Sequence, residues 1–522
     1  MKRKMLTFLI VLLLLLIAVY WSGFTTDAKE MNDRPSQKTT AKPVVVLVVD
    51  SLMDKPLKQA IQSGRAPALQ FFMEKGTYYP EMISSYPTMS VTIDSTILTG
   101  TYADEHKLPG LVWYDQADNR IINYGSARGE LVRLGLKNAI KDGVYRMNHH
   151  HLSRNVQTVH EELHRAGRQS ASINGMIYRG DIKHPLAVPR ALSRFNFLPE
   201  ELVVEAPDLF VLGSLSHYDP INKKNAQAWQ SFGMNDAFTV QELKNLVHKG
   251  KLPSFTLAYL PDLDKPVHQK GANDLKGIEK VDKELQKLLD SFDSWEEAKE
   301  KVVWVIMGDS GQTPVKEKHD NALIKLPSLS EHFTVEVGTG QISKEDQLVL
   351  ALNERMAYIY LLDDDLAYED VLSRLESDER IGWIAWKDDE VNHVQSGQTR
   401  LRYSKGGDLE DEYGVSWKME GDPTVLDLFI NGDQKIKSGD YPDALSRLYG
   451  ALHSQEGRFL IVDAKPGYEF ATKHSPTHAG GASHGSLYWE DSLAPMIVVG
   501  TDERPATNRH VDLKDWFLQL TK

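Results

Sequence analysis

The segment DKPVH places an aspartate and a histidine, Asp264 and His268, four residues apart. On a helix this spacing puts both side chains on one face, and a tight loop could also bring them to one cation. Two further acids, Asp50 and Asp309, each end an apolar run, and His484 precedes another such run. Because carboxylates and imidazoles are common metal ligands, these residues are candidates for a metal site if the fold brings them together.

A hydroxyl-rich segment supplies a different kind of candidate. In SYPTMSVTIDSTILTG, Ser85 to Gly100, seven of sixteen residues carry a Ser or Thr hydroxyl. Such segments usually cap helices or line polar turns, which is the structural alternative to a reactive group. The segment alone does not identify a nucleophile, so the elements around it have to be considered.

The elements that would position these residues alternate between strands and helices. Three apolar runs end in acids and read as strands buried on both faces: VVVLVVD (Val44–Asp50), FTLAYLPDLD (Phe255–Asp264) and VVWVIMGDS (Val302–Ser310). Helical patterns lie between them, such as GIEKVDKELQKLLDSF with its apolar residues on one face. The pattern predicts an α/β fold with a mostly parallel central sheet flanked by helices. In such sheets the active site lies beyond the carboxyl ends of the strands, where these acids would gather.

The predicted organisation has five parts. Residues 1–26 read as a signal anchor or signal peptide, 27–42 as a flexible linker, and 43–380 as the first part of the α/β core. From 381 to 460 short alternating strands with turn signals, followed by a helical pattern, indicate a small inserted α+β lobe. Residues 461–522 return to the core with APMIVVG as another buried strand.

The N-terminus predicts export. Lys2, Arg3 and Lys4 precede an apolar run from Met5 to Trp21, interrupted only by Thr7. This length is near the lower limit for a membrane span and long for a cleaved signal peptide. We expect a single-pass membrane protein with the body of the chain outside the cytoplasm, and secretion after signal cleavage is the alternative. With no cysteine, the exported body has no disulfides.

The amino-acid composition restricts the classes of molecule that the protein can bind. The net charge of −13 argues against binding of nucleic-acid polymers, whose phosphates need clusters of Lys and Arg. A small phosphate ester remains a possible substrate because metal ions could supply positive charge locally. The oligomeric state is not predicted by the sequence.

The order of the motifs matches a known family. The five segments are VVVLVVDS, YPTMSVTIDSTILTGTYADEHKLPG, PDLDKPVHQKG, GDSGQTPV and SHGSLYWEDSLAPMIVVG. In this order the chain resembles the alkaline phosphatase superfamily and, within it, the type I phosphodiesterase/nucleotide pyrophosphatase family. The resemblance runs from about Val44 to Gly500 and implies an alkaline-phosphatase-like core.

The resemblance also implies a centre of two divalent metal ions beside a Ser or Thr nucleophile. By position, Ser90 takes the nucleophile's place and also contacts a metal. The ligands of one ion, with Zn²⁺ expected, would be Asp264, His268 and His484, and Asp262 is an alternative that lacks the spacing to His268. Asp50 and Asp309 would hold the other ion, which would lower the pKa of the serine hydroxyl.

Ser90 would also begin a helix, VTIDSTILTG, that ends with Gly100 as a C-terminal cap. A helix N-terminus favours a phosphoryl group through its free N–H donors and its dipole. Ser90 is therefore our candidate nucleophile. Thr88 is the second candidate, although a bond within its own turn is the simpler role.

One motif departs from the family pattern. Members usually have Asp-His-Gly where this chain has Asp309-Ser310-Gly311. With Ser310 as the ligand, the Asp50/Asp309 site becomes all-oxygen, which suits Mg²⁺, Mn²⁺ or Ca²⁺ better than Zn²⁺. Alternatives are a substitute imidazole from elsewhere (His319, His474 or His478) and a site too weak for catalysis.

A second departure concerns substrate binding. The resemblance places Leu111 where nucleotide pyrophosphatases have a phosphate-binding Asn, and Lys107 where Gly is usual. The sequence thus predicts a metal-dependent hydrolase of phosphate esters, a phosphodiesterase or phosphatase. The rivals are a sulfatase or phosphoglycerol-type transferase of the same superfamily, and a non-catalytic surface binding protein. The sulfatase motif Cys/Ser-x-Pro-x-Arg is absent at Ser90.

Overall fold

A seven-stranded sheet forms the centre of the helix-flanked half of the molecule. The structure, a computed structural model, describes residues 26–31, 41–126, 136–194, 196–336, 342–473 and 475–522. The strand order is β2 (Thr77–Ile83), β25 (Leu493–Val499), β10 (Val303–Gly308), β1 (Val44–Val49), β9 (Phe255–Leu260), β5 (Ser170–Ile173) and β8 (Leu209–Val211). The five strands from β10 to β8 are parallel, and only β25 runs antiparallel to its neighbours. The predicted α/β fold with a mostly parallel sheet is confirmed.

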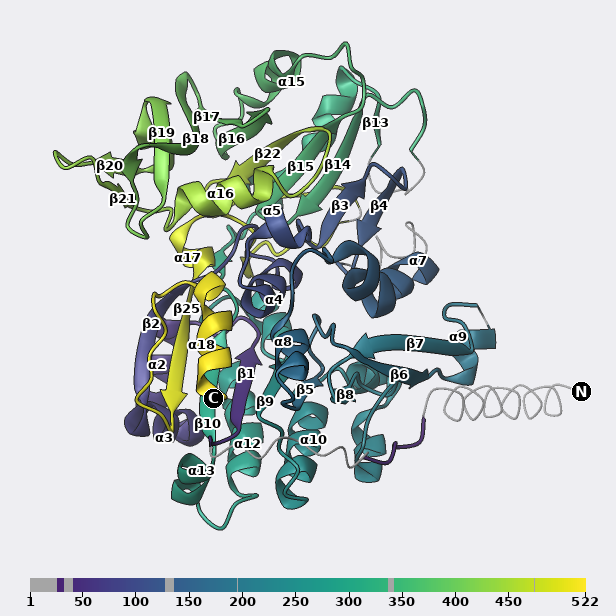
Figure 1. The fold of residues 1–522 in the computed structure, drawn as a ribbon. Coiled ribbons are helices and arrows are strands. Elements are labelled where there is room, and N and C mark those ends of the chain that lie inside the picture. Colours follow the sequence, from purple (N-terminus) through teal and green to yellow (C-terminus); the bar gives the residue numbers. More distant parts are fainter. Residues whose placement is uncertain (1–25, 32–40, 127–135, 195, 337–341, 474) are drawn as a thin grey trace, which may run out of the picture.

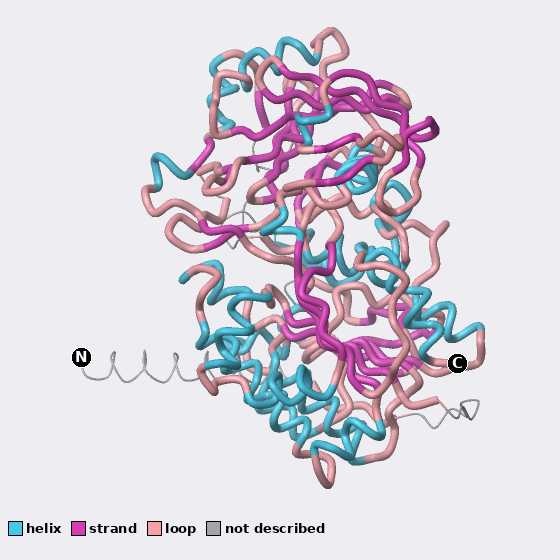
Figure 2. Tube along the Cα trace, turned by 90° about the vertical axis from the view of Figure 1, so that its left-hand side faces the viewer, coloured by secondary structure: helices cyan, strands magenta, loops and turns pink. Residues whose placement is uncertain are grey.

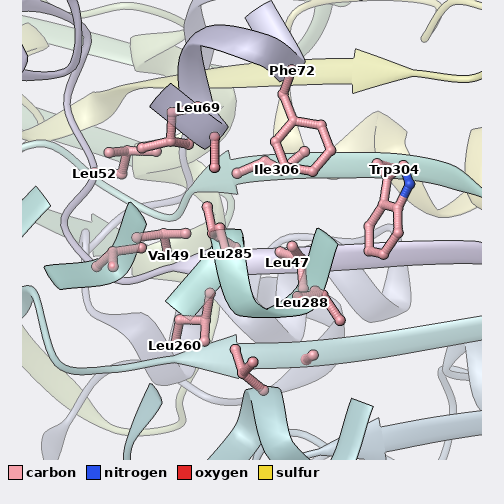
Figure 3. Packing of buried hydrophobic residues seen from close by; sticks show 14 of the residues in the cluster. Leu47, Val49, Leu52, Leu69, Phe72, Leu260, Leu285, Leu288, Trp304 and Ile306 are labelled. Atoms are coloured by element: carbon pink, nitrogen blue, oxygen red, sulfur yellow. The ribbon is translucent and has the colours of Figure 1, made fainter. Parts of the chain in front are cut away.

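Helices cover both faces of this sheet because its central strands are apolar on both sides. Every residue of β1, β9 and β10 is buried. Val45, Leu47 and Val49 of β1 belong to one cluster, which includes residues of α2 (Asp54–Gln62), α3 (Pro67–Lys75) and α12 (Leu275–Leu289). Figure 3 shows Leu69, Phe72 and Leu285 against this face. The alternate β1 residues pack against α4 (Ser90–Thr99), α8 (Val159–Arg165) and α18 (Leu513–Leu520).

A second sheet occupies the opposite end of the molecule (Figure 1). Its eight strands are, in spatial order, β13 (Val335–Glu336), β14 (Leu348–Asn353), β15 (Met356–Leu361), β22 (Arg458–Ala464), β16 (Ile381–Asp388), β17 (Val391–Ser396), β18 (Thr399–Glu410) and β19 (Ser416–Gly421). Apart from the β13–β14 pair, neighbours are antiparallel. Helix α15 (Tyr368–Leu375) packs on one face and α16 (Ala444–Leu452) on the other. Figure 2 shows the strand-rich end and the helix-flanked end from a second side.

The second sheet is wider than the lobe predicted for residues 381–460. Strands β13, β14 and β15 precede that segment, and β22 extends beyond it. The reason is local: LVLALN and MAYIYL are continuous apolar runs with every residue buried, so they resemble strands of the parallel core.

The predicted N-terminal anchor, residues 1–26, lies outside the described residues except for Thr26. Within the part of the chain that the structure covers, no helix is both long and apolar enough to cross a membrane. Part of the predicted linker contacts the body: the Lys29 N–H donates to the His217 carbonyl oxygen over 2.8 Å.

Candidate active site

Three aspartates meet at the carboxyl edge of the central sheet. Asp50 follows β1 and Asp309 follows β10, while Asp264 begins helix α11 (Asp264–Lys270) just after β9. These strands are neighbours in the order β10-β1-β9, and all three are parallel. The topology therefore brings the three acids to one place.

Ser51 connects these aspartates. Its N–H donates to Asp309 Oδ1 over 2.9 Å, and its hydroxyl lies 3.1 Å from Asp50 Oδ1 and 3.0 Å from Asp264 Oδ1. Ser51 has a φ of 60°, a left-handed conformation that non-glycine residues seldom adopt. Such a conformation is maintained only where surrounding contacts fix it, and it is common at functional sites.

Ser90 is the first residue of α4, the buried helix that ends at Gly100 with a φ of 67°. Its hydroxyl donates to Asp309 Oδ2 over 2.8 Å. Thr88, the second candidate, is fully buried and accepts a hydrogen bond from the Gly485 N–H at 2.7 Å. Of the two hydroxyls, Ser90 lines the cavity described below, and Thr88 ties two loops together.

The two predicted ligand histidines lie on the other side of Asp264. His268 is one turn after Asp264 on α11, with Nε2 2.9 Å from Asp264 Oδ1, so the helical alternative for the DKPVH segment is the one observed. The His268 and His484 rings are 5.3 Å apart between centroids. Asp264, His268 and His484 each offer a ligand atom within 4.8 Å of the others. Asp262 instead faces α10 (Asp236–His248), where its carboxylate accepts from the Asp236 N–H at 3.2 Å.

Sequence reasoning missed Glu354 and the role of its neighbours. Glu354 lies in the two-residue turn between β14 and β15 and has a φ of 60°. Its carboxylate lies 3.8 Å from His268 Nε2, 3.7 Å from His478 Nδ1 and 4.0 Å from His484 Nε2. A hairpin of the second sheet thus completes a pocket that begins on the first sheet. The only sequence signal was the Gly-rich stretch around His478, next to His484.

Burial and neighbouring charges shift the pKa values of the acids and histidines in this site. Burial, together with the charge of Asp309, raises the pKa of Asp50 well above its usual value, and Tyr259 donates a hydrogen bond to Asp50 Oδ2. Burial also raises the pKa of Asp309. For His268 burial acts downward, but the carboxylates of Glu354 and Asp264 raise its pKa to about 10. Conversely, despite burial, the neighbouring histidines hold the pKa of Glu354 far below its usual range.

A cavity of about 900 Å³ opens from this site. Asp50, Ser90, Asp264, His268 and His484 line one end of it. The remaining wall is largely apolar and includes Met89, Leu111, Met147, Met176, Tyr178 and Leu215. The volume is in the usual range for small-molecule sites.

Comparison with known proteins identifies the family of the chain. Residues 44–487 match the family described as type I phosphodiesterase / nucleotide pyrophosphatase. The chain belongs to this family. The family consists of phosphoric ester hydrolases that generally use two metal ions. No curated protein sequence matches the chain significantly.

Solved structures with the same fold include members of the wider superfamily. Murine ectonucleotide pyrophosphatase/phosphodiesterase 5 is 12% identical, with a TM-score of 0.54 over 92% of this chain and 95% of that one. The human protein of the same name is 14% identical, with a TM-score of 0.55 and the same coverage. Phosphonoacetate hydrolase from Sinorhizobium meliloti 1021, solved with phosphonoformate, is 14% identical, with a TM-score of 0.53 over 95% of this chain and 100% of that one.

The structure shows the surroundings of the three residues that depart from the motifs of this phosphodiesterase family: Ser310, Lys107 and Leu111. The Ser310 hydroxyl is fully buried and has no hydrogen-bond partner among the described residues, while its N–H donates to Asp309 Oδ1 at 2.8 Å. Lys107 Nζ donates to the His453 carbonyl oxygen at 2.9 Å rather than lining the cavity, whereas Leu111 does line it. Of the possible substitute histidines, His478 reaches the pocket, on the His268 side. His474 and the side chain of His319 lie outside the described part of the chain.

Proposed function

We propose that this chain is an exported, metal-dependent hydrolase of small phosphate esters with Ser90 as its nucleophile. The observation that carries the proposal is the hydrogen bond from Ser90 Oγ to Asp309, at the end of the cavity that Asp264, His268 and His484 also line. A hydroxyl at the first position of a helix also faces its free N–H groups, which favour a phosphoryl group there.

The residues present fit divalent metal ions. Asp264, His268 and His484 supply the one-carboxylate, two-imidazole set that suits Zn²⁺. Asp50 and Asp309, with the hydroxyls of Ser90 and Ser310, would offer oxygen atoms suited to Mn²⁺ or Mg²⁺ as well as Zn²⁺. When bound, such ions neutralise phosphoryl charge and lower the pKa of a bound hydroxyl.

The protein's own groups account for the remaining steps. Asp309 Oδ2 accepts the hydrogen bond from the Ser90 hydroxyl, so it orients that hydroxyl and is placed to take its proton. Ser90 Oγ then forms a bond to phosphorus as the bond to the leaving alcohol oxygen breaks, and that oxygen takes a proton from water. Attack of water on the phosphoserine releases phosphate or a phosphomonoester and restores the Ser90 hydroxyl.

A panel of three substrates across a metal series tests this function. We expect purified protein to hydrolyse bis-p-nitrophenyl phosphate or p-nitrophenyl phosphate with Zn²⁺ or Mn²⁺, and to lose this activity with a chelator. Turnover of p-nitrophenyl sulfate alone would indicate a sulfatase instead. No turnover of any of the three would favour the non-catalytic binding protein, the reading that the replacement of the metal-binding His by Ser310 supports.

We also propose that residues 1–26 anchor the chain in the membrane with its body outside the cytoplasm. The supporting feature is the apolar run Met5–Trp21 behind three basic residues. Protease treatment of intact cells tests this placement. Digestion of the body at the cell surface is expected, and protection in intact cells but not in lysed ones would contradict it.

A further inference from the structure

The Glu354 carboxylate lies at the centre of three imidazoles. The distances from its oxygens to His268, His478 and His484 are 3.8, 3.7 and 4.0 Å. All four side chains are mostly buried, with exposed fractions between 8% and 13%. The His268 and His478 rings stack with their centroids 4.2 Å apart. Glu354 and His478 are additional to the family's ligand pattern described above.

Each of the three histidines has one ring nitrogen occupied by an oxygen acceptor. Nδ1 of His268 lies 2.8 Å from the Ala482 carbonyl oxygen, and Nδ1 of His484 contacts the Thr88 carbonyl oxygen. Nδ1 of His478 lies 2.8 Å from Glu469 Oε2. Since the two carbonyl oxygens can only accept, Nδ1 of His268 and of His484 carries the hydrogen, and their Nε2 atoms are left as ligand atoms facing Glu354. In His478, Nδ1 contacts both Glu469 and Glu354. Fixing a histidine by its second nitrogen is the usual arrangement behind a metal ligand.

The charges of the cluster call for a cation. Among the described residues, the ion pairs of Asp264, Glu354 and Glu469 involve only histidines, with no Lys or Arg. Buried carboxylates without such partners are unfavourable unless they bind protons or metal ions.

Two ligands on one tetrahedral zinc ion are about 3.3 Å apart, given bonds of about 2.0–2.1 Å. The separations around Glu354, 3.7 to 4.0 Å, are about 0.4–0.7 Å larger than this. The Asp264–His268 separation of 2.9 Å is smaller.

The backbone conformation of Glu354 supports a functional role for its carboxylate. Its φ of 60° lies at a hairpin position where glycine is the favoured residue. A glutamate at such a position is strained unless its side chain makes a compensating interaction. Ser483 Oγ and the His484 N–H also donate to Glu354 Oε2, at 2.8 and 3.2 Å, so the carboxylate is fixed in the pocket.

We propose that Glu354 and His478 are ligands of the divalent metal ion bound at His268. His268, Glu354 and His478 each offer a ligand atom within 4.8 Å of the others, and they share His268 with the Asp264/His484 group. Ser310 stands beside Asp309 where the family usually has a metal-binding histidine. Glu354 and His478 add a carboxylate and an imidazole on the opposite side of the pocket, beside His268. The inference rests on the metal dependence in the proposed function, but it can be measured without turnover.

Metal affinity in matched variants tests the proposal. We would measure Zn²⁺ affinity of the full chain by competition with a chromophoric chelator, comparing wild type with Glu354→Gln and His478→Gln. Each substitution is expected to weaken affinity by about tenfold or more. His393→Gln is the control, because His393 stacks on Trp386 in the second sheet and does not line the cavity. Unchanged affinity in both ligand variants would overturn the proposal.

Substitution with Co²⁺ provides a second measurement. The visible absorption of bound Co²⁺ reports its ligands, so His478→Gln should shift the bands even if Glu354→Gln folds poorly, while identical spectra would overturn the proposal. Ser90→Ala separates this proposal from the proposed function, since it should abolish turnover and retain Co²⁺ at His268. Wild type that binds metal through Glu354 but hydrolyses no ester would support the site and reject the hydrolase.

Discussion

Ser90 Oγ donates a hydrogen bond to Asp309 Oδ2 over 2.8 Å, which links the start of α4 to the end of β10. The two residues are 219 positions apart in the chain, and their contact depends on the packing of α4 against the sheet. The hydroxyl proton therefore faces a buried carboxylate before any substrate is bound.

Replacement of Ser90 by alanine should abolish hydrolysis. We expect kcat for p-nitrophenyl esters to fall by about 10³-fold or more, since removal of a nucleophile leaves only residual catalysis. Thr92→Val is the matched control, because Thr92 lies in the same helix with a buried hydroxyl that lacks a hydrogen-bond partner among the described residues. Its activity should stay within a few-fold of wild type. Undiminished turnover in Ser90→Ala would assign the nucleophile elsewhere.

Ser310→His should strengthen Zn²⁺ binding beside Asp309. The substitution restores an imidazole to a position that now has only oxygen donors. Since Ser310 is fully buried, the larger side chain should also lower the free energy of unfolding by about 1–3 kcal/mol. Retention of a second zinc equivalent during dialysis against a weak chelator is the measurement. Ser310→Asn, which adds bulk without an imidazole, should not gain this retention; equal zinc content in both variants would contradict the expectation.

The apolar cavity predicts a preference for esters with apolar groups. In a series of alkyl p-nitrophenyl phosphates, kcat/KM should rise by up to about fourfold for each added CH₂, the equivalent of about 0.8 kcal/mol. Met176→Ser should weaken the dependence because Met176 lines the cavity, whereas Met419→Ser on β19 should not. A series with no dependence on chain length would show that the alkyl group stays in water.

Arg355→Met should destabilise the protein by about 3–5 kcal/mol. Arg355 is fully buried, donates to Asp491 and Thr313, and also donates to the Ala464 carbonyl oxygen at 3.0 Å. The substitution leaves Asp491 buried without its charge partner. Urea unfolding is the measurement. Arg402→Met, which removes an exposed pair with Glu420, should cost less than about 1 kcal/mol, and an equally small loss in Arg355→Met would contradict the argument.

The buried Asp463 should make the free energy of unfolding depend on pH. Burial raises its pKa from 3.8 to about 7, although Ser486 Oγ and the Leu487 N–H donate to it. The folded state therefore binds the proton more tightly than the unfolded state. This contribution to stability is full below pH 3.8 and is lost as the pH rises through about 7. The destabilisation caused by Asp463→Asn, measured by urea unfolding, should be larger at pH 5 than at pH 8; equal values at both would contradict the shift.

The sequence predicted those parts of the site that follow strand ends and family motifs. Asp50 and Asp309 could be placed because each directly follows a fully apolar run, and in this chain those two runs form the neighbouring parallel strands β1 and β10. Glu354 could not be placed, because nothing in LVLALNERMAYIYL shows that its turn reaches a pocket on another sheet. A positive φ on a glutamate also has no signature in the sequence. The start of the second sheet was missed for a related reason, since buried strands of either sheet type look alike when all their residues are apolar.

The β14–β15 hairpin carries Glu354 into a pocket that is lined mostly by residues of the α/β half. A shortened version that kept only the α/β half would therefore lose part of its inner surface, however well that half folded alone. Laboratory evolution of substrate choice should find more freedom in the outer strands β17 to β19 than at this turn. Relatives with another appendage in place of the second sheet would need a different way to close the pocket beside His268.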